Sequence, residues 1–502
     1  MTTIIKKKIR GRYYYYAVES KRVNGKPRIV WQKYLGKVSD IVTAVSGLDR
    51  LPAPQSSRIY DFGAEAALLA TGRRLGVEEI INRHVPRPGA GPGAGESLLL
   101  HSIHLFANPG VKPAQWFERT VLKRHFNFTA RDFSTKRFSG LAELLTPETL
   151  ENIQNDLARK IFEEFGLKPD ALVYHCLKAP GCAGARPGKG SPLPLFFSLL
   201  ATKEFRIPLF YATHRGGEAN DGETGKIVRR LLEQYRNLGF DSKEVTLVNR
   251  DPGGKPLDSL YLPAEGMAPL RYIGELFPEE CEDYLKVPLE RFHPLRHGQR
   301  EKIKVYRTAK KGEEKSSVIL VVQHEDETAA HHEGTEAGVA GCRSLRRILS
   351  SDNIHWDNGE IYEAYFGRRE LEDSLQRMAA RSGALSAPKG ERQAGAAAFC
   401  LVLALTLQGL LKRELQRCGV TGSNAELLKI LSGMREVAVT YAIGESQLRK
   451  KEYVIMAELD HGQKKVFDCL KLQRFTAGGG CEEANRAGPA CRDGGERERN
   501  FS

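Results

Sequence analysis

The sequence predicts an α/β fold for the largest part of the chain. Short apolar runs at residues 171–174 and 245–248 are typical of strands buried on both faces of a sheet. Two further apolar runs, at 194–201 and 207–211, are joined by a short polar link that indicates a hairpin. Residues 224–238 carry apolar side chains at helical spacing. Strands interspersed with an amphipathic helix indicate the α/β class.

Residues 1–50 are expected to form a separate basic β module. Aromatic and β-branched residues at 12–18 favour a strand, and Asn24-Gly25 is a tight-hairpin signal before a return strand at 27–36. Residues 1–37 carry eleven Lys or Arg against one acid. A small sheet of this charge is suited to contact a DNA backbone, and a structural cap with solvated lysines is the alternative. The candidate DNA contacts are Lys6, Lys7, Lys8, Arg10 and Arg12.

A helical domain is predicted over residues 51–168. Helical patterns occur at 96–107, 113–125 and 147–165, and Pro147 stands where proline is favoured at the start of a helix. The block carries several basic residues. It is therefore either a DNA-binding domain or a helical scaffold.

The remainder of the chain is predicted to hold a strand-rich insert and a second helical region. The insert lies at about 295–345, with strands at 303–307 and 317–323, and helices follow over 357–415. The apolar run at 396–407 suits a buried core helix and is short for a membrane span. Residues 476–502 have no periodic apolar pattern, which predicts a disordered tail.

Charge and cysteine content narrow the class of protein. The formal net charge is +14 and the pI about 9.2, which favours a polyanionic partner such as nucleic acid. Nine cysteines occur without a Cys-x-x-Cys pair, which argues against a zinc ribbon or a thioredoxin-like site. An odd cysteine count without a signal peptide fits a reducing cytoplasm. We therefore expect a cytoplasmic, nucleoid-associated protein.

Several motifs, in this order, resemble a known family. They are Gly25-Lys-Pro-Arg, Lys33-Tyr-Leu-Gly36, Arg206-Ile-Pro-Leu-Phe-Tyr211 followed by Gly216 and Asp221, and the segments 361–375 and 396–411. Together they resemble the DDE-type transposases of bacterial insertion sequences. The resemblance implies an RNase-H-like catalytic domain over 169–475 with a β-strand insert. It also implies Mg²⁺-dependent DNA strand cleavage and transfer, double-stranded DNA of the element's terminal repeats as partner, and a homo-oligomer.

The catalytic acids of such a family are incompletely present. The family places one Asp after the first strand, a second after a later strand, and a Glu on a helix, to hold two Mg²⁺ ions. This chain has His175 at the first place, and a neutral imidazole is a poor Mg²⁺ ligand. At the second place it has Asn249 and Arg250, with Asp251 one residue late, which would turn the side chain to the other face of a strand. The third acid, Glu372, is retained.

The candidate site therefore comprises Glu372, Asp251 and His175, with Glu372 and Asp251 as the metal ligands if the protein is active. An ion pair between Glu372 and Arg368 or Arg369 is the alternative role for that carboxylate. Arg368, Arg369 and Lys189, which lies in a basic loop, are further candidate DNA contacts.

Three functions are consistent with these residues. The first is a transposase-like DNA-binding protein whose cleavage activity is impaired, because two metal-binding acids are missing from their expected positions. The second is an active transposase that uses Asp251, Glu372 and Mg²⁺. The third is a basic RNA-associated or scaffold protein, which a structure lacking an RNase-H-like sheet beside the Glu372 helix would favour.

Overall fold

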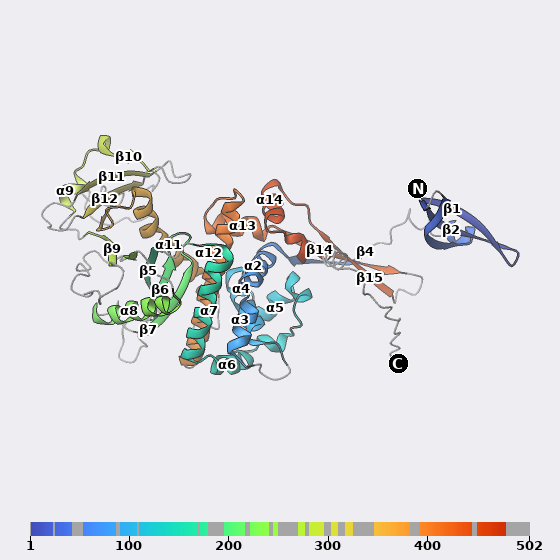
Figure 1. The fold of residues 1–502 in the computed structure, drawn as a ribbon, viewed down its shortest axis with the longest axis horizontal. Helices are drawn as coiled ribbons and strands as arrows, with labels where there is room; N and C mark the ends of the chain where they lie inside the picture. The colour runs from blue at the N-terminus through green and yellow to red at the C-terminus, as the bar shows by residue number, and fades with distance from the viewer. Residues whose placement is uncertain are drawn as a thin grey trace. The chain divides into compact units, whose positions relative to one another are not determined.

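The computed structural model (Figure 1) describes most of the chain. The described residues are 2–23, 26–42, 54–86, 91–107, 110–167, 171–178, 195–215, 221–239, 244–248, 270–276, 281–295, 303–309, 317–324, 346–381, 391–443 and 449–477. The chain divides into two compact units, one comprising 1–59 and 437–455 and the other 60–436 and 456–502. The expected domain boundaries at 50, 168 and 475 stay a prediction.

The N-terminal segment of the first unit is a three-stranded antiparallel sheet. Its strands are β1 (Thr2–Ile9), β2 (Arg12–Val23) and β3 (Lys26–Gly36), with β2 in the centre. β2 and β3 stay paired up to Val23 and Lys26, on either side of Asn24-Gly25, which lie outside the described residues. The strands expected at 12–18 and 27–36 are thus present. A second sheet has the order β15-β14-β4 and comprises β4 (Pro54–Asp61), β14 (Arg435–Ile443) and β15 (Arg449–Met456).

The second unit contains a helical part whose core is continuous with one face of a large sheet. Its helices are α2 (Gly63–Leu75), α3 (Val77–His84), α4 (Ala94–Ala107), α5 (Pro113–Phe117), α6 (Thr135–Leu144), α7 (Pro147–Phe165), α12 (Glu391–Arg417), α13 (Asn424–Ser432) and α14 (His461–Cys469). Helix α7 begins where expected, because the Thr146 side chain accepts the Thr149 N–H and Pro147 follows.

Helix α12 is the central helix of that core. It is long and apolar enough to cross a membrane by length and composition, and 89% of its apolar window is buried inside the protein. The apolar run at 396–407 is buried in full, as the sequence predicts for a core helix.

The large sheet has nine strands in the order β10-β11-β12-β13-β9-β8-β5-β6-β7. Its first five strands along the chain are β5 (Ala171–Lys178), β6 (Leu195–Thr202), β7 (Pro208–Arg215), β8 (Glu244–Val248) and β9 (Leu270–Glu275). β6 pairs antiparallel with both β5 and β7, whereas β5, β8 and β9 are parallel neighbours. The β6–β7 hairpin was expected. The fold is therefore mixed α/β with a large mixed sheet.

The insert extends this sheet through antiparallel strands. They are β10 (His293–Pro294), β11 (Ile303–Ala309), β12 (Val318–His324) and β13 (Arg346–Ser351), and β13 pairs with β9. The strands expected at 303–307 and 317–323 are present as β11 and β12. Residues 325–345 and most of the expected tail, 478–502, lie outside the described residues.

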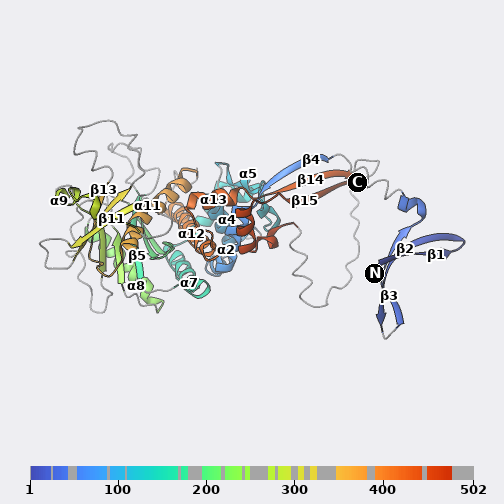
Figure 2. The ribbon, with the colours of Figure 1, turned by 90° about the horizontal axis from the view of Figure 1, so that it is seen from above.

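Two helices complete this part of the fold. α8 (Asp221–Asn237) connects β7 to β8, and α11 (Asn358–Arg381) follows β13. Figure 2 shows α11 beside β5 and the insert strands. The first half of α11 packs with Val173 and Val248 through Ile361 and Tyr362. Its second half, which includes Leu371, joins the main core.

One disulfide joins the end of α12 to α14. Cys418 and Cys469, which are 51 residues apart in the sequence, form the bond. Neither residue lies in a spacing motif that would predict its partner.

Candidate functional site

The candidate site lies where three parallel strands end. Because β5, β8 and β9 run in the same direction, their carboxyl ends lie at one edge of the sheet. In open α/β sheets this edge is where ligands usually bind. Helix α11, which carries Glu372, is attached to the sheet at this edge by side chains.

Arg368 makes two of these attachments. Its guanidinium Nη2 donates to the carbonyl oxygen of Cys176 in β5 at 2.7 Å, and Nη1 donates to that of Val248 in β8 at 3.4 Å. Its Nε donates to Oε1 of Glu372, one helical turn later, at 3.0 Å. Arg368 is 7% exposed. A single buried cation thus joins the ends of two strands and positions the Glu372 carboxylate beside them.

Tyr365 attaches α11 to the third strand. Its hydroxyl donates to Oε2 of Glu275, the last residue of β9, at 2.8 Å, and Arg347 of β13 donates to Oε1 at 2.9 Å. Burial, followed by the negative charge of Glu275, raises the pKa of Tyr365 far above its usual value. The phenol therefore stays protonated and remains a donor.

Arg206 packs against α11 from the β6–β7 turn. Its backbone is left-handed, with φ 51°, and its buried guanidinium donates to the Glu363 carbonyl at 3.2 Å and to Glu370 at 2.7 Å. Burial alone would raise the pKa of Glu370, but the positive charges of Lys412 and Arg206 outweigh it and lower that pKa. Gly367 leaves the space that the guanidinium fills.

Arg206, Tyr365 and Glu275 were not predicted as site residues from the sequence. A signal was available for one of these contacts. Gly367 interrupts an otherwise good helical pattern, and a glycine inside a helix often marks a close approach by another group.

His175 is buried in β5 on the face that α11 covers. It is 0% exposed, and neither ring nitrogen has a hydrogen-bond partner among the described residues. Burial, followed by the positive charges of Arg368 and Arg206, lowers the pKa of His175 well below its usual value. The ring is therefore neutral near pH 7, and it sits close to two cations where a metal site would need anions.

The described residues do not fit a Mg²⁺ site. Among them, no group of three or more His, Cys, Asp or Glu side chains lies close enough together to hold a metal ion. Glu372 is the only carboxylate of the expected set that the structure describes, and its Oε1 is bound to Arg368. Asp251 lies outside the described residues, as does Lys189.

Some of the candidate DNA contacts are exposed, and others are engaged by neighbouring groups of the protein. Lys6, Lys8, Arg10 and Arg12 are exposed in the β1–β3 sheet, and Arg369 is exposed on α11. Lys7 lies on the opposite face of its strand from Lys6 and Lys8, and its Nζ donates to Oε1 of Gln32 at 3.0 Å. Arg368 is turned inward, where it binds carbonyl oxygens and Glu372. We assign Arg368 an internal positioning role in place of the expected DNA contact.

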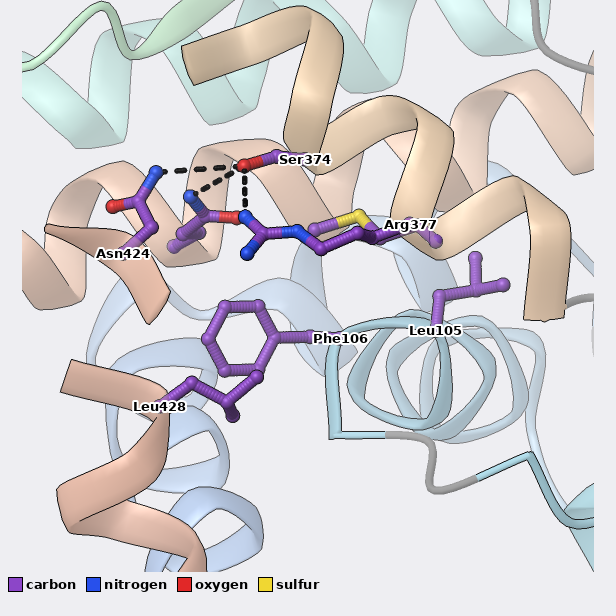
Figure 3. Close-up of a pocket in the computed structure, with 8 residues that line it drawn as sticks. Leu105, Phe106, Ser374, Arg377, Asn424 and Leu428 are labelled. Carbon is purple, nitrogen blue, oxygen red and sulfur yellow. Dashed lines mark hydrogen bonds between the residues drawn. The ribbon is translucent and has the colours of Figure 1, made fainter. Parts of the chain in front are cut away.

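A small pocket lies away from this edge, between α4, α11, α12 and α13. It is lined by Leu105, Phe106, Ser374, Arg377, Met378, Gln408, Asn424 and Leu428. The Ser374 hydroxyl accepts from nitrogen donors of Arg377 and Asn424, which Figure 3 shows, and from Nε2 of Gln408. The amide oxygen of Gln408 is buried and has no hydrogen-bond partner among the described residues.

Comparison with known proteins yields similarity to solved structures and to no named family. No protein-family model and no curated protein matches the chain. Among solved structures, it is similar to the cryo-EM structure of a piggyBac transposase synaptic complex with hairpin DNA, at 13% sequence identity and a TM-score of 0.34. The match covers 73% of this chain and 79% of that chain. A TM-score of this size does not establish a shared fold, so the proposed function rests on the described residues.

Proposed function

We propose that the chain is a transposase-like DNA-binding protein of insertion-sequence origin. Its ancestral reaction was Mg²⁺-dependent DNA strand cleavage and transfer, and this activity is impaired in the present chain. Its partner is double-stranded DNA at the element's terminal repeats, which it binds as a homo-oligomer.

The observation that carries the proposal is the attachment of α11 to the carboxyl ends of β5 and β8 through Arg368. The resemblance requires a first strand, a later strand and a glutamate-bearing helix to meet at one place, and Glu372 lies there. The sheet order supports the same assignment. In the sheet, the first five strands of the chain lie in the order β7-β6-β5-β8-β9. Only β6 runs antiparallel to the other four. This order is the one that the resemblance to RNase-H-like transposases leads us to expect, and it supports the proposal.

The impairment follows from charge. Two Mg²⁺ ions need several hard anionic ligands in octahedral geometry. Here a neutral imidazole, His175, stands in the first position, and the retained Glu372 is engaged by a buried guanidinium. Among the described residues, the site is rich in positive charge and short of carboxylates.

Binding and its salt dependence test the proposal directly. The full-length protein is titrated with duplex DNA that carries the sequences flanking its own gene, at several salt concentrations. We expect affinity to fall steeply as salt rises, because each phosphate contact releases a condensed counterion. Absence of DNA binding at low salt, or an affinity that does not change with salt concentration, would overturn the proposal.

A second candidate function is an active transposase that uses Asp251, Glu372 and Mg²⁺. It is favoured by the position of Glu372 at the strand ends. The two candidates separate in a nicking assay on the same duplex with Mg²⁺. Product that disappears in Glu372→Ala would establish the active enzyme, whereas intact DNA in the presence of measurable binding supports the impaired one.

A further inference from the structure

The two faces of the β1–β3 sheet differ in chemistry. In an antiparallel pair, residues that face one another across the strands project to the same side. Between β1 and β2, Lys8 lies opposite Tyr13 and Ile4 lies opposite Ala17. Between β2 and β3, Ala17 lies opposite Lys33. Trp31 projects to the same side, opposite Glu19. We call this side the lysine–aromatic face and define it by Ile4, Lys6, Lys8, Tyr13, Trp31 and Lys33.

The other face is partly packed by its own side chains, although Tyr34 on it is 55% exposed. The Tyr16 and Tyr34 rings lie 5.3 Å apart between centroids, and the Lys7 ammonium lies 4.8 Å from the Tyr16 centroid. Lys7 also donates to Gln32, and Val18 is buried among these groups. The Lys7 ammonium on this face is therefore already engaged by Gln32 and Tyr16.

The lysine–aromatic face is open. Ile4 is 59% exposed, Tyr13 48% and Trp31 47%. The ammonium of Lys6 lies 4.4 Å from the Tyr13 ring centroid and that of Lys8 lies 5.7 Å from it. The only acid of the segment, Glu19, has the Lys21 ammonium 3.8 Å away. The face therefore offers positive charge beside aromatic rings that are about half exposed.

We propose that the lysine–aromatic face binds single-stranded DNA, with phosphates at Lys6, Lys8 and Lys33 and bases stacked on Trp31 and Tyr13. This inference rests on the proposed function and names the form of DNA that this part of the chain takes. A closed duplex presents only base edges in its grooves, so exposed rings have nothing to stack on. Unpaired bases stack readily on aromatic side chains in a basic groove.

The spacing of the lysines fits this ligand. Two residues apart on one strand, Lys6 and Lys8 emerge about 7 Å from each other on the same face. They can therefore contact neighbouring phosphates of one extended strand, while the rings beside them receive its bases.

Tryptophan fluorescence gives a direct readout. The chain has three tryptophans, and Trp116 and Trp356 are 1% and 4% exposed, which leaves Trp31 as the exposed reporter. We expect an oligothymidylate of about 20 nucleotides to quench the emission of the full-length protein. The Trp31→Phe variant should bind with similar affinity and lose the quenching. Quenching that persists in this variant would overturn the stacking assignment.

Matched variants then test the face by fluorescence anisotropy with the labelled oligonucleotide and with a duplex of equal length. Trp31→Ala should lower single-strand affinity about fivefold or more, with less than a twofold effect on the duplex. Lys6→Ala combined with Lys8→Ala should weaken single-strand binding and flatten its salt dependence. Lys7→Ala, on the opposite face, is the control because that ammonium is engaged by Gln32, and it should change single-strand affinity less than about twofold.

The outcomes separate this inference from the proposed function. If the protein binds duplex DNA in a salt-dependent way, but Trp31→Ala and the Lys6, Lys8 double variant leave single-strand affinity unchanged, the inference is overturned and the proposed function stands. Equal losses for single strands and duplex would assign the face to duplex DNA. A protein that binds neither form of DNA would overturn both proposals. Circular dichroism of each variant checks that the sheet has remained folded.

Discussion

Gly367 and Arg206 are in close contact, so that a Cβ at position 367 would lie 2.3 Å from the guanidinium carbon of Arg206. The guanidinium is buried and held by Glu363 and Glu370, so it cannot move aside without breaking ion pairs. The glycine in the middle of α11 is therefore a packing requirement of the candidate site.

Gly367→Ala is expected to destabilise the protein by about 1–3 kcal/mol through overpacking, although alanine is the better helix former. The matched control is Gly140→Ala in α6, where a Cβ would meet nothing within 4 Å. That change should stabilise by about 0.5–1 kcal/mol. Urea denaturation of both variants measures the two effects. An equal gain from the two substitutions would contradict the contact.

Glu372→Ala should destabilise the fold even if the protein has no cleavage activity. It leaves the buried Arg368 without its carboxylate partner, at a cost of about 2 kcal/mol for a charged hydrogen bond. Asp373→Ala removes the same charge from the exposed neighbouring position and should change stability by less than about 0.5 kcal/mol. If the two variants unfold at the same urea concentration, Glu372 is a solvated surface acid.

His175 makes stability depend on pH in a defined direction. The folded protein keeps the ring neutral, whereas the unfolded chain gains a proton below about pH 6.5. The unfolded state then binds more protons, so stability is fully present above about pH 6.5 and is lost as the pH falls below it.

His175→Leu removes this dependence together with an unpaired buried polar ring. We expect the variant to be more stable than the parent by about 1 kcal/mol near neutral pH. This difference in stability should increase toward about pH 5. Thermal melting at the two pH values measures it. A variant less stable than the parent at both would show that the ring has a partner, and DNA affinity should be unchanged in either case.

The disulfide between Cys418 and Cys469 should contribute measurably to stability. It closes a loop between residues 51 positions apart, for which chain entropy predicts about 2–4 kcal/mol. Reductant should lower the melting temperature of the parent protein. The Cys418→Ser, Cys469→Ser double variant should have a lower melting temperature than the parent, and reductant should not change it. A parent whose melting is unaffected by reductant would contradict the bond.

The sequence by itself determined the local elements and the missing chemistry. The apolar runs at 171–174, 207–211 and 245–248 predicted strands, and residues 396–407 predicted a core helix, because these signals depend on neighbours along the chain. The replacement of an expected acid by His175 is likewise visible in the residues alone.

Only the tertiary structure decided which groups meet. Arg368 was predicted as a DNA contact, and its inward orientation depends on carbonyl oxygens of Cys176 and Val248, which are 192 and 120 residues away in the chain. The pairing of Cys418 with Cys469 and the division of Lys6, Lys7 and Lys8 between two faces likewise depend on elements packing together. No periodicity along the chain encodes such contacts, because they arise when segments remote in sequence share one core.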